Sequence, residues 1–351
     1  VAVAGAAVVS RRLHGRITFA DDPRARWVEE PGVFVRVAIL AGAVDVAVVS
    51  VLADFWSTEA VGGLSATKAV SLTLAAAVRV VGYRSAVQTL VRADQQRARS
   101  RAVPSGNLRL SVVVPTYKEQ SRIASTVARL RGAGLAEEGD LEIVVVDDGS
   151  PDDTVAAAKA AGADHVVALP ANRGKGAAVR AGMLAATGRA VVFTDADLAY
   201  PPEQIAHVLA ALEAGADVVI GSRRHVDTTT LVRARRLREV TGRLFNLLTY
   251  VVLLGNYRDT QCGLKGFQHD AAQLVFSRTR IDGFAFDVEV LHLAERLRLT
   301  LREVPVELAN TTESTVRVGR DSLRMLWDVF RIRRLAVRGE YDSPPPPTSA
   351  N

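Results

Sequence analysis

Apolar runs alternate with acidic loops through the middle of the chain. Short β-branched runs at residues 110–115, 141–146 and 191–193 each end in a polar segment, and an alanine-rich helical pattern follows residues 170–176. Strand, acidic loop and helix in alternation are typical of a largely parallel α/β sheet. In such sheets the ligand site lies at the carboxyl ends of the strands. We therefore expect an α/β domain whose functional residues directly follow its strands.

Acidic side chains collect at these expected strand ends. Like charges gathered at one edge are costly unless a cation lies among them. Asp195 and Asp197 follow the run at 191–193, and in an extended chain residues i and i+2 point to the same side. Two such carboxylates suit Mg²⁺ or Mn²⁺, which also take phosphate oxygens from a substrate. The alternative is a loop whose aspartates only cap a helix. The acidic set is Glu119, Asp147, Asp148, Asp195 and Asp197.

Seven motifs in a fixed order carry a family resemblance. VVPTYKE, VVDDGSPDDT, NRGKGAAVRAGM and FTDADL resemble the nucleotide-sugar-binding half of a family 2 glycosyltransferase with the GT-A fold. GSRRH, DTQCGLKGF and GFAFDVEVL resemble the subgroup that glycosylates polyprenyl phosphates, nearest to dolichyl-phosphate β-glucosyltransferases and next to polyprenyl-phosphate mannose synthases. The likeness covers roughly residues 108–338. It implies a Rossmann-like mixed α/β sheet, a nucleotide sugar donor and a polyprenyl phosphate acceptor.

The resemblance assigns donor-side roles to the strand ends. It implies that a metal at Asp195 and Asp197 bridges the donor diphosphate and stabilises the leaving group as a Lewis acid. Asp147 or Asp148 would accept hydrogen bonds from the base or the ribose, although residues 148–153 also fit a simple turn and helix N-cap. The residues implied in nucleotide-sugar binding are Pro115, Thr116, Glu119, Asp147, Asp148, Lys175, Asp195 and Gln261.

Lys175 lies between Gly174 and Gly176, just before the alanine-rich helical pattern. Glycines let a backbone approach a ligand closely, and the N-terminus of a helix carries a partial positive charge that favours phosphate. Lys175 is therefore predicted to face the donor phosphates. The alternative is a solvated loop lysine.

Arginines dominate the predicted acceptor side. Arg223 is a candidate for holding a phosphate, since the guanidinium fork matches phosphate geometry. Five arginines between residues 233 and 243 precede the apolar run 244–255, which is too short to span a membrane as a helix. This order predicts a helix near 235–256 that lies in the membrane interface, with Arg238 on the acceptor phosphate. Residues 320–338 predict a second interface helix. For the first helix the alternative is a solvated basic face, and for the second it is an ordinary amphipathic helix packed on the domain.

The reaction depends on what Asp287 does. A hydroxyl acceptor needs a general base, and Asp287 is the first candidate for it. A phosphate acceptor is already anionic at neutral pH because its second pKa is about 6. We therefore assign Asp287 to positioning of the sugar or the acceptor and expect an inverting displacement. The likeness of DTQCG and FAFDVE implies UDP-glucose as the donor, with GDP-mannose as the second choice. Leu264 and Gly266 depart from the expected pattern and leave the shape of the sugar pocket open. The predicted catalytic set is Asp197, Arg223, Arg238 and Asp287.

The N-terminal region has a different character. Residues 33–53 and 64–81 are apolar and predict a two-helix membrane hairpin within 33–91, which resembles half of a GtrA-type membrane domain. Asp45 lies inside the first run and would have to face protein. The arginine-rich flank 91–101 favours the cytoplasmic side for the catalytic domain. The alternative is a soluble helical pair. Residues 1–32 and 339–351 predict poorly ordered segments, and 92–107 a linker.

Composition narrows the partners. The chain is 48% hydrophobic with a net charge of +6, which suits an anionic membrane surface or phosphorylated ligands. Aromatic residues make up only 5%, and no zinc-ligand spacing is present, so nucleic acid is not expected as a partner. The single cysteine, Cys262, excludes an intrachain disulfide and is expected to be a buried thiol.

Overall fold

The structure, a computed structural model, describes residues 105–137, 139–222, 262–308 and 320–342, together with separate helical positions between 36 and 82. The chain divides into two compact units, residues 1–93 and 94–351. Arg223, Arg238, Gln261 and the predicted interface helix near 235–256 lie outside the described residues.

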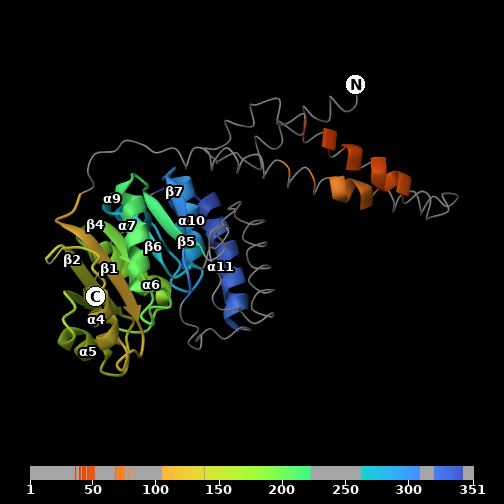
Figure 1. The fold of residues 1–351 in the computed structure, drawn as a ribbon. Coiled ribbons are helices and arrows are strands. Elements are labelled where there is room, and N and C mark those ends of the chain that lie inside the picture. The colour runs from red at the N-terminus through yellow and green to blue at the C-terminus, as the bar shows by residue number, and fades with distance from the viewer. Residues whose placement is uncertain are drawn as a thin grey trace. The chain divides into compact units, whose positions relative to one another are not determined.

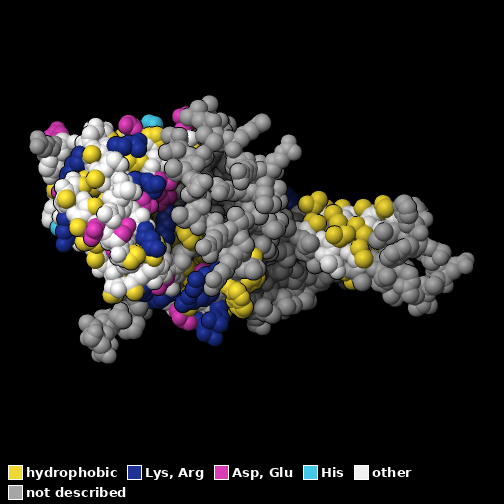
Figure 2. Space-filling view, turned by 90° about the horizontal axis from the view of Figure 1, so that it is seen from below, with side chains coloured by type: hydrophobic (Ala, Val, Ile, Leu, Met, Phe, Trp, Pro, Cys, Tyr) yellow, Lys and Arg dark blue, Asp and Glu magenta, His cyan; other side chains and the backbone are white. Residues whose placement is uncertain are grey.

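The first unit is helical at each described position. Several of its large apolar side chains are exposed, among them Ile39, Leu40, Val46 and Leu72, and Figure 2 shows the yellow side chains of these helices grouped together. Within the described positions, no helix is both long and apolar enough to cross a membrane. Much of the membrane hairpin expected at 33–91 lies outside the described residues.

The second unit is built on a mixed sheet (Figure 1). Its seven described strands are ordered β3-β2-β1-β4-β6-β5-β7. They are β1 (Leu108–Thr116), β2 (Leu141–Asp147), β3 (His165–Ala168), β4 (Gly188–Phe193), β5 (Val218–Ser222), β6 (Lys265–Gln268) and β7 (Leu301–Pro305). Of these, β6 alone runs antiparallel to its neighbours, β4 and β5. The predicted mixed α/β sheet is confirmed.

Helices cover both faces of this sheet, as the alternation within each strand dictates. Val112 and Val114 of β1 pack in one core cluster and Val113 in the other. Helices α4 (Ile123–Gly132), α5 (Thr154–Ala160) and α7 (Ile205–Glu213) supply the first cluster. Helices α6 (Lys175–Ala185), α9 (His269–Phe276), α10 (Phe286–Arg296) and α11 (Arg320–Val337) supply the second.

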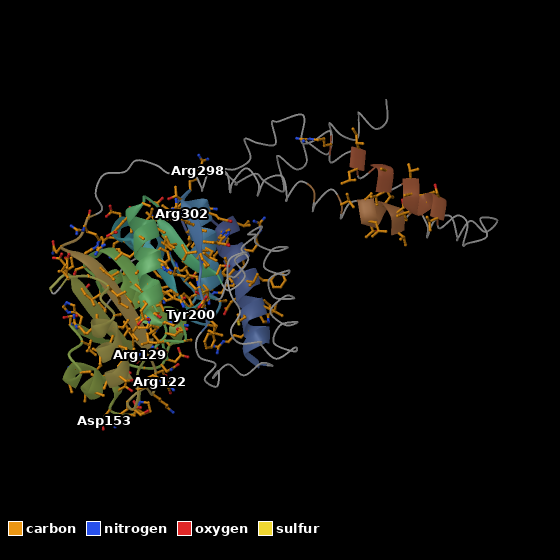
Figure 3. The ribbon with its side chains drawn as sticks, in the orientation of Figure 1. Arg122, Arg129, Asp153, Tyr200, Arg298 and Arg302 are labelled. Carbon is orange, nitrogen blue, oxygen red and sulfur yellow. The ribbon has the colours of Figure 1, made fainter. Side chains whose placement is uncertain are left out.

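The chain direction fixes where loops can gather. Strands β1, β2, β3 and β4 are parallel, so all four end at one edge, called here the carboxyl edge. In Figure 3 this edge lies toward Arg122 and Asp153, whereas Arg298 and Arg302, beside the start of β7, lie at the opposite amino edge. The antiparallel β6 begins at the carboxyl edge, because Lys265 is paired in register with Phe193, the last residue of β4.

Helix α11 confirms the helix predicted over 320–338 and has two different faces. Met325, Val329, Ile332 and Leu335 are buried in the core. Trp327 is 75% exposed and Phe330 is 55% exposed, although both are large apolar side chains. The helix therefore packs on the domain as an amphipathic helix and also presents aromatic side chains outward.

Candidate functional site

An alternating row of charges lies at the carboxyl edge. Lys175 Nζ contacts Asp195 Oδ1 at 2.5 Å, with the two side chains 23% and 31% exposed. Lys265 Nζ contacts Asp287 Oδ1 at 2.6 Å and is fully buried. Asp287 is close enough to Lys175 that its charge raises the pKa of that lysine. Two predicted residues, Lys175 and Asp195, are thus brought together, and Asp287 joins them from α10.

Burial and neighbouring charges have opposite effects on the pKa values of Lys175 and Asp287, the two inner members of this row. Burial on its own lowers the pKa of Lys175, but the carboxylates of Asp195, Asp287 and Asp197 outweigh it and raise that pKa above its ordinary value. Burial raises the pKa of Asp287, and Lys265 and Lys175 only partly offset this. The site is therefore arranged around charge pairs, and in the described residues each acid of the row has a lysine in contact or close by.

Asp195 and Asp197 lie on a turn, not in an extended chain. Strand β4 ends at Phe193, and the amide of Leu198 donates to the carbonyl of Asp195 at 3.0 Å. Asp197 Oδ1 accepts from the amide of Ala199 at 3.0 Å. The expectation that the pair shares one side of an extended strand is wrong, because the chain turns as soon as it leaves the sheet. Both carboxylates nevertheless stay near Lys175, whose pKa each of them raises.

Gly263 lies against the carboxylate of Asp195. A Cβ atom on this glycine would lie 2.2 Å from Asp195 Oδ2, so any other residue here would force the carboxylate to move. Gly263 belongs to the turn before β6, and Lys265 Nζ ties that turn down by donating to the carbonyl of Cys262 at 2.6 Å. Cys262 is buried and forms no disulfide, as predicted. Gly263 and Lys265 were not predicted as site residues; the available signal was their place in the DTQCGLKGF motif.

The end of β1 carries Thr116 and leads to Glu119. Thr116 is buried, and its hydroxyl donates to the carbonyl of Val146. Glu119 Oε2 accepts from Arg122 Nη1 at 2.8 Å, with Arg122 labelled in Figure 3. Burial raises the pKa of Glu119, the charge of Arg122 opposes that rise, and the charge of Asp197 adds to it. Glu119 therefore lies within electrostatic range of the predicted metal pair.

Asp147 and Asp148 are adjacent but differ in what they bind. Asp148 accepts from the amide of Arg173 at 2.9 Å and from the amide of Gly174 at 2.8 Å, one on each oxygen. Its first role is therefore to hold the loop before α6. Asp147 Oδ2 accepts from the amide of Ser150, but its buried Oδ1 has no hydrogen-bond partner. A buried acceptor without a partner is costly, which makes Asp147 the better of the two for a ligand.

The first amides of α6 have a protein acceptor. The amides of Gly176 and Ala177 both donate to the carbonyl of Asp282, at 2.8 and 3.3 Å. The prediction that Lys175 faces a phosphate therefore depends on its side chain more than on these two amides. What the loop offers a phosphate is the side chain of Lys175.

The donor set at this edge suits a hard divalent cation. Asp195 and Asp197 supply carboxylate oxygens, the ligands that Mg²⁺ and Mn²⁺ prefer. Among the described residues, no group of three or more acids, histidines or cysteines is arranged to hold a metal. Two carboxylates fit a cation that takes its other ligands from water and substrate phosphates, as Mg²⁺ commonly does.

Fold and site together define an α/β domain with a charged carboxyl edge. The family model described as Glycosyl transferase family 2 matches residues 111–276, which contain Lys175, Asp195 and Gly263. The chain belongs to this family and is a glycosyltransferase.

Individual relatives indicate which members of the family this chain is similar to. A protein of Drosophila melanogaster named dolichyl-phosphate beta-glucosyltransferase is 37% identical over 65% of this chain and 75% of its own length. Proteins of the same name from Dictyostelium discoideum and Saccharomyces cerevisiae are 33% and 31% identical, over 66% and 69% of this chain and 75% and 81% of their own. The recognised family resemblance is confirmed.

Solved structures share the fold. Glucosyl-3-phosphoglycerate synthase from Mycobacterium tuberculosis in complex with uridine diphosphate has a TM-score of 0.51 and 23% identity, over 70% of this chain and 84% of that one. The same enzyme with Mn²⁺, uridine-diphosphate-glucose and phosphoglyceric acid has a TM-score of 0.50 and 23% identity, over 69% of this chain and 82% of that one. At this identity the likeness supports the fold alone.

Proposed function

We propose that this enzyme transfers glucose from UDP-glucose to a polyprenyl or dolichyl phosphate, with inversion and with a divalent metal. The names of the relatives support the sugar and the acceptor. One observation in the site carries the acceptor class: Asp287 Oδ1 is held at 2.6 Å by the fully buried Lys265. Although burial raises the pKa of Asp287, protonation of its carboxylate would leave the buried lysine unpaired, which disfavours a role as general base. A phosphate acceptor needs no base, whereas a hydroxyl acceptor does.

The residues of the row divide the work between them. Asp195 and Asp197 would hold Mg²⁺ or Mn²⁺, which when bound supplies a Lewis acid for the departing diphosphate. Lys175 adds a positive charge at the same place, and Asp147 offers its unpartnered Oδ1 to a donor group of the nucleotide. Pro115, Thr116 and Glu119 line the neighbouring strand end, with Gln261, Arg223 and Arg238 proposed for the sugar and the acceptor phosphate. Catalysis then consists of positioning and of charge neutralisation fixed in advance.

Membrane association belongs to this proposal. Trp327 and Phe330 are exposed on α11, and Arg331 and Arg334 are exposed at helical spacing from them. Aromatic and basic side chains on one face suit a helix lying on an anionic membrane surface. The exposed apolar side chains of the first unit add a second surface of this kind. The arginine-rich flank at 91–101 favours the cytoplasmic side.

The experiment uses purified full-length protein in detergent with Mg²⁺ and polyprenyl phosphate, and with labelled UDP-glucose or GDP-mannose in parallel. Label is counted in the organic phase, with Asp197→Ala as the inactive control. We expect transfer from UDP-glucose and none from the control. Transfer from GDP-mannose alone would mean that the donor is GDP-mannose and not UDP-glucose. In a parallel reaction that also contains 3-phosphoglycerate, label that reaches this compound but not the lipid would overturn the acceptor.

A further inference from the structure

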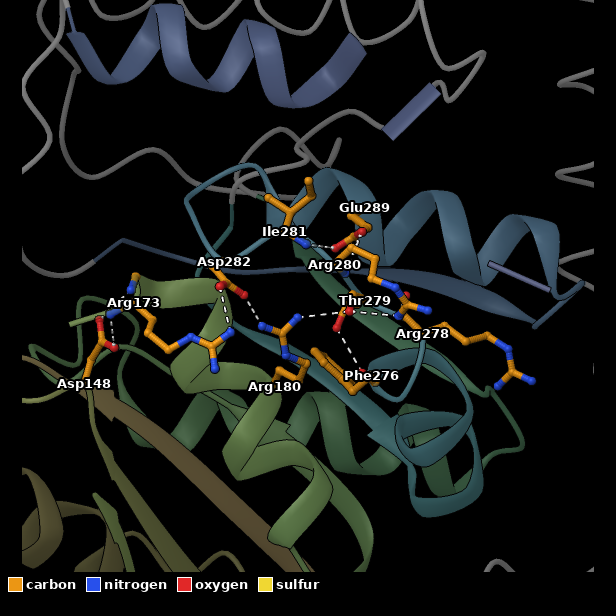
Figure 4. A network of polar contacts seen from close by, with 11 residues as sticks. Asp148, Arg173, Arg180, Phe276, Arg278, Thr279, Arg280, Ile281, Asp282 and Glu289 are labelled. Atoms are coloured by element: carbon orange, nitrogen blue, oxygen red, sulfur yellow. Dashed lines mark hydrogen bonds and ion pairs between the residues drawn. The ribbon is translucent and has the colours of Figure 1, made fainter. Parts of the chain in front are cut away.

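Segment Arg280–Asp282 lies directly on the loop that carries Lys175. The carbonyl of Asp282 accepts from the first amides of α6, those of Gly176 and Ala177. Its carboxylate binds Arg173 Nη2 at 3.0 Å and forms an ion pair with Arg180. Figure 4 shows Asp282 between these two arginines. Because Arg173 precedes Lys175 and Arg180 follows it, Asp282 grips the loop on both sides of the lysine.

The glycines beside Lys175 make this grip possible. A Cβ atom on Gly174, whose φ is +116°, would lie 2.5 Å from the carbonyl oxygen of Asp282. A Cβ on Gly176 would lie 2.6 Å from the carbonyl oxygen of Ile281. The two glycines therefore allow the backbone of residues 281–282 to approach, which is a different reason for the Gly-Lys-Gly sequence from the one predicted.

The other side of the loop is held by Asp148, which accepts from the amides of Arg173 and Gly174. Figure 4 shows Asp148 beside Arg173. The backbone on either side of Lys175 is thus fixed by two aspartates from distant parts of the sequence. With its backbone fixed, Lys175 reaches Asp195 at 2.5 Å.

A fully buried carboxylate locks the segment from behind. Glu289 accepts from the amides of Arg280 and Ile281 at 2.8 and 2.9 Å. It also accepts from the hydroxyl of Tyr341 at 2.7 Å. Tyr341 follows α11, so the C-terminal helix is connected through Glu289 to the segment that grips the lysine loop.

We propose that Asp282 is a positioning residue for Lys175, held in place by Glu289 and Tyr341. It acts by fixing the loop that directs the ammonium of Lys175 at Asp195, and it does not itself touch substrate. The proposal rests on the proposed function in one respect: the effect on catalysis requires that Lys175 contact the donor diphosphate. The fixing of the loop is independent of any substrate.

The kinetic test is a double-mutant cycle in the full-length enzyme. Asp282→Asn keeps the size of the side chain and removes its charge, and we expect the kcat/KM for UDP-glucose to fall about tenfold, as misplacement of a binding group does. In the Lys175→Met background the same change is expected to cost less than about twofold, because the group it positions is gone. Asp342→Asn, which breaks the distant ion pair with Arg296, is the matched control and should leave kcat/KM unchanged. Equal losses in both backgrounds would overturn the proposal.

Hydrogen–deuterium exchange tests the grip without substrate. We expect Asp282→Asn and Tyr341→Phe to speed exchange in peptides that cover residues 173–178, while Asp342→Asn does not. Unchanged exchange in the first two variants would overturn the proposal even if transfer fell. If the wild type transfers no glucose from UDP-glucose, the proposed function fails, and the exchange result alone decides on Asp282. Tyr341→Phe removes a single hydroxyl and keeps the test available if Asp282→Asn does not fold.

Discussion

The two ends of strand β2 treat a buried carboxylate in opposite ways. At the amino edge, Glu142 accepts from the hydroxyl of Ser111 and from the amide and hydroxyl of Thr187, at 2.9 and 3.0 Å for the latter two. At the carboxyl edge, the equally buried Asp147 keeps one oxygen without a partner. At the amino edge the carboxylate of Glu142 is hydrogen-bonded within the protein and stabilises the fold. At the carboxyl edge Asp147 keeps an oxygen that a ligand can use.

The largest effect is expected at the carboxyl edge. Asp195→Ala removes a predicted metal ligand and the partner of Lys175, so transfer should fall about 10³-fold, as when a group that stabilises transition-state charge is lost. Treatment of the wild type with EDTA should produce a similar loss that Mn²⁺ restores. In the variant, EDTA should have no further effect, and a variant that keeps a tenth of the activity would remove Asp195 from the site.

Gly263→Ala tests the same edge without removing a charge. Its Cβ would lie 2.2 Å from Asp195 Oδ2, so the carboxylate must move. We expect kcat/KM to fall about 10- to 100-fold because displacement of a ligand by an ångström is costly. Gly132→Ala, at the last residue of α4 with open space around its Cβ position, is the matched control. Equal activity of the two variants would mean that Asp195 need not lie where the structure has it.

The amino edge should show the reverse behaviour. Glu142→Gln replaces an acceptor oxygen by a donor amide that faces other donors, so we expect about 1–3 kcal/mol less stability against urea. Activity per folded molecule should not change. Glu213→Gln, in an exposed pair with Arg109, should cost less than about 1 kcal/mol. A loss of kcat/KM in Glu142→Gln at unchanged stability would break the comparison between the two edges.

Local pattern predicted the strands and the residues that follow them, because apolar runs and acidic ends are features of contiguous sequence. It could not predict which partner each side chain finds. Lys265 and Asp287 are 22 residues apart, and Asp148 meets the amide of Arg173 across 25. Asp282 gave no signal, since every residue has a carbonyl like the one it uses, and the two arginines that its carboxylate binds lie 109 and 102 residues away in the sequence. The turn at Asp195 was not predicted, because the apolar run before it has the pattern of a strand up to its last residue.

Glu289 sharpens the comparison because it is fully partnered, like Glu142, yet lies beside the carboxyl edge. Burial raises its pKa, although the hydroxyl of Tyr341 and the amides of Ile281 and Arg280 work against that rise. An acid whose pKa is raised on folding binds protons more tightly in the native state, so stability falls as the pH rises from the ordinary value of 4.5 through the raised pKa. The slope for one proton is at most about 1.4 kcal/mol per pH unit.

The smallest expected effect is a fall of stability with rising pH, which follows from the raised pKa of Glu289. Urea unfolding from pH 4.5 upward should show a decline in the wild type that is shallower in Glu289→Gln, with the remainder due to other acids whose pKa burial also raises, among them Asp287 and Glu119. Tyr341→Phe removes a hydrogen bond that lowers the pKa of Glu289, so its decline should extend to higher pH. A slope that is the same in all three proteins would mean that Glu289 has a similar pKa folded and unfolded. Its burial would then be matched by its hydrogen bonds, and it would belong with Glu142 as a purely structural acid.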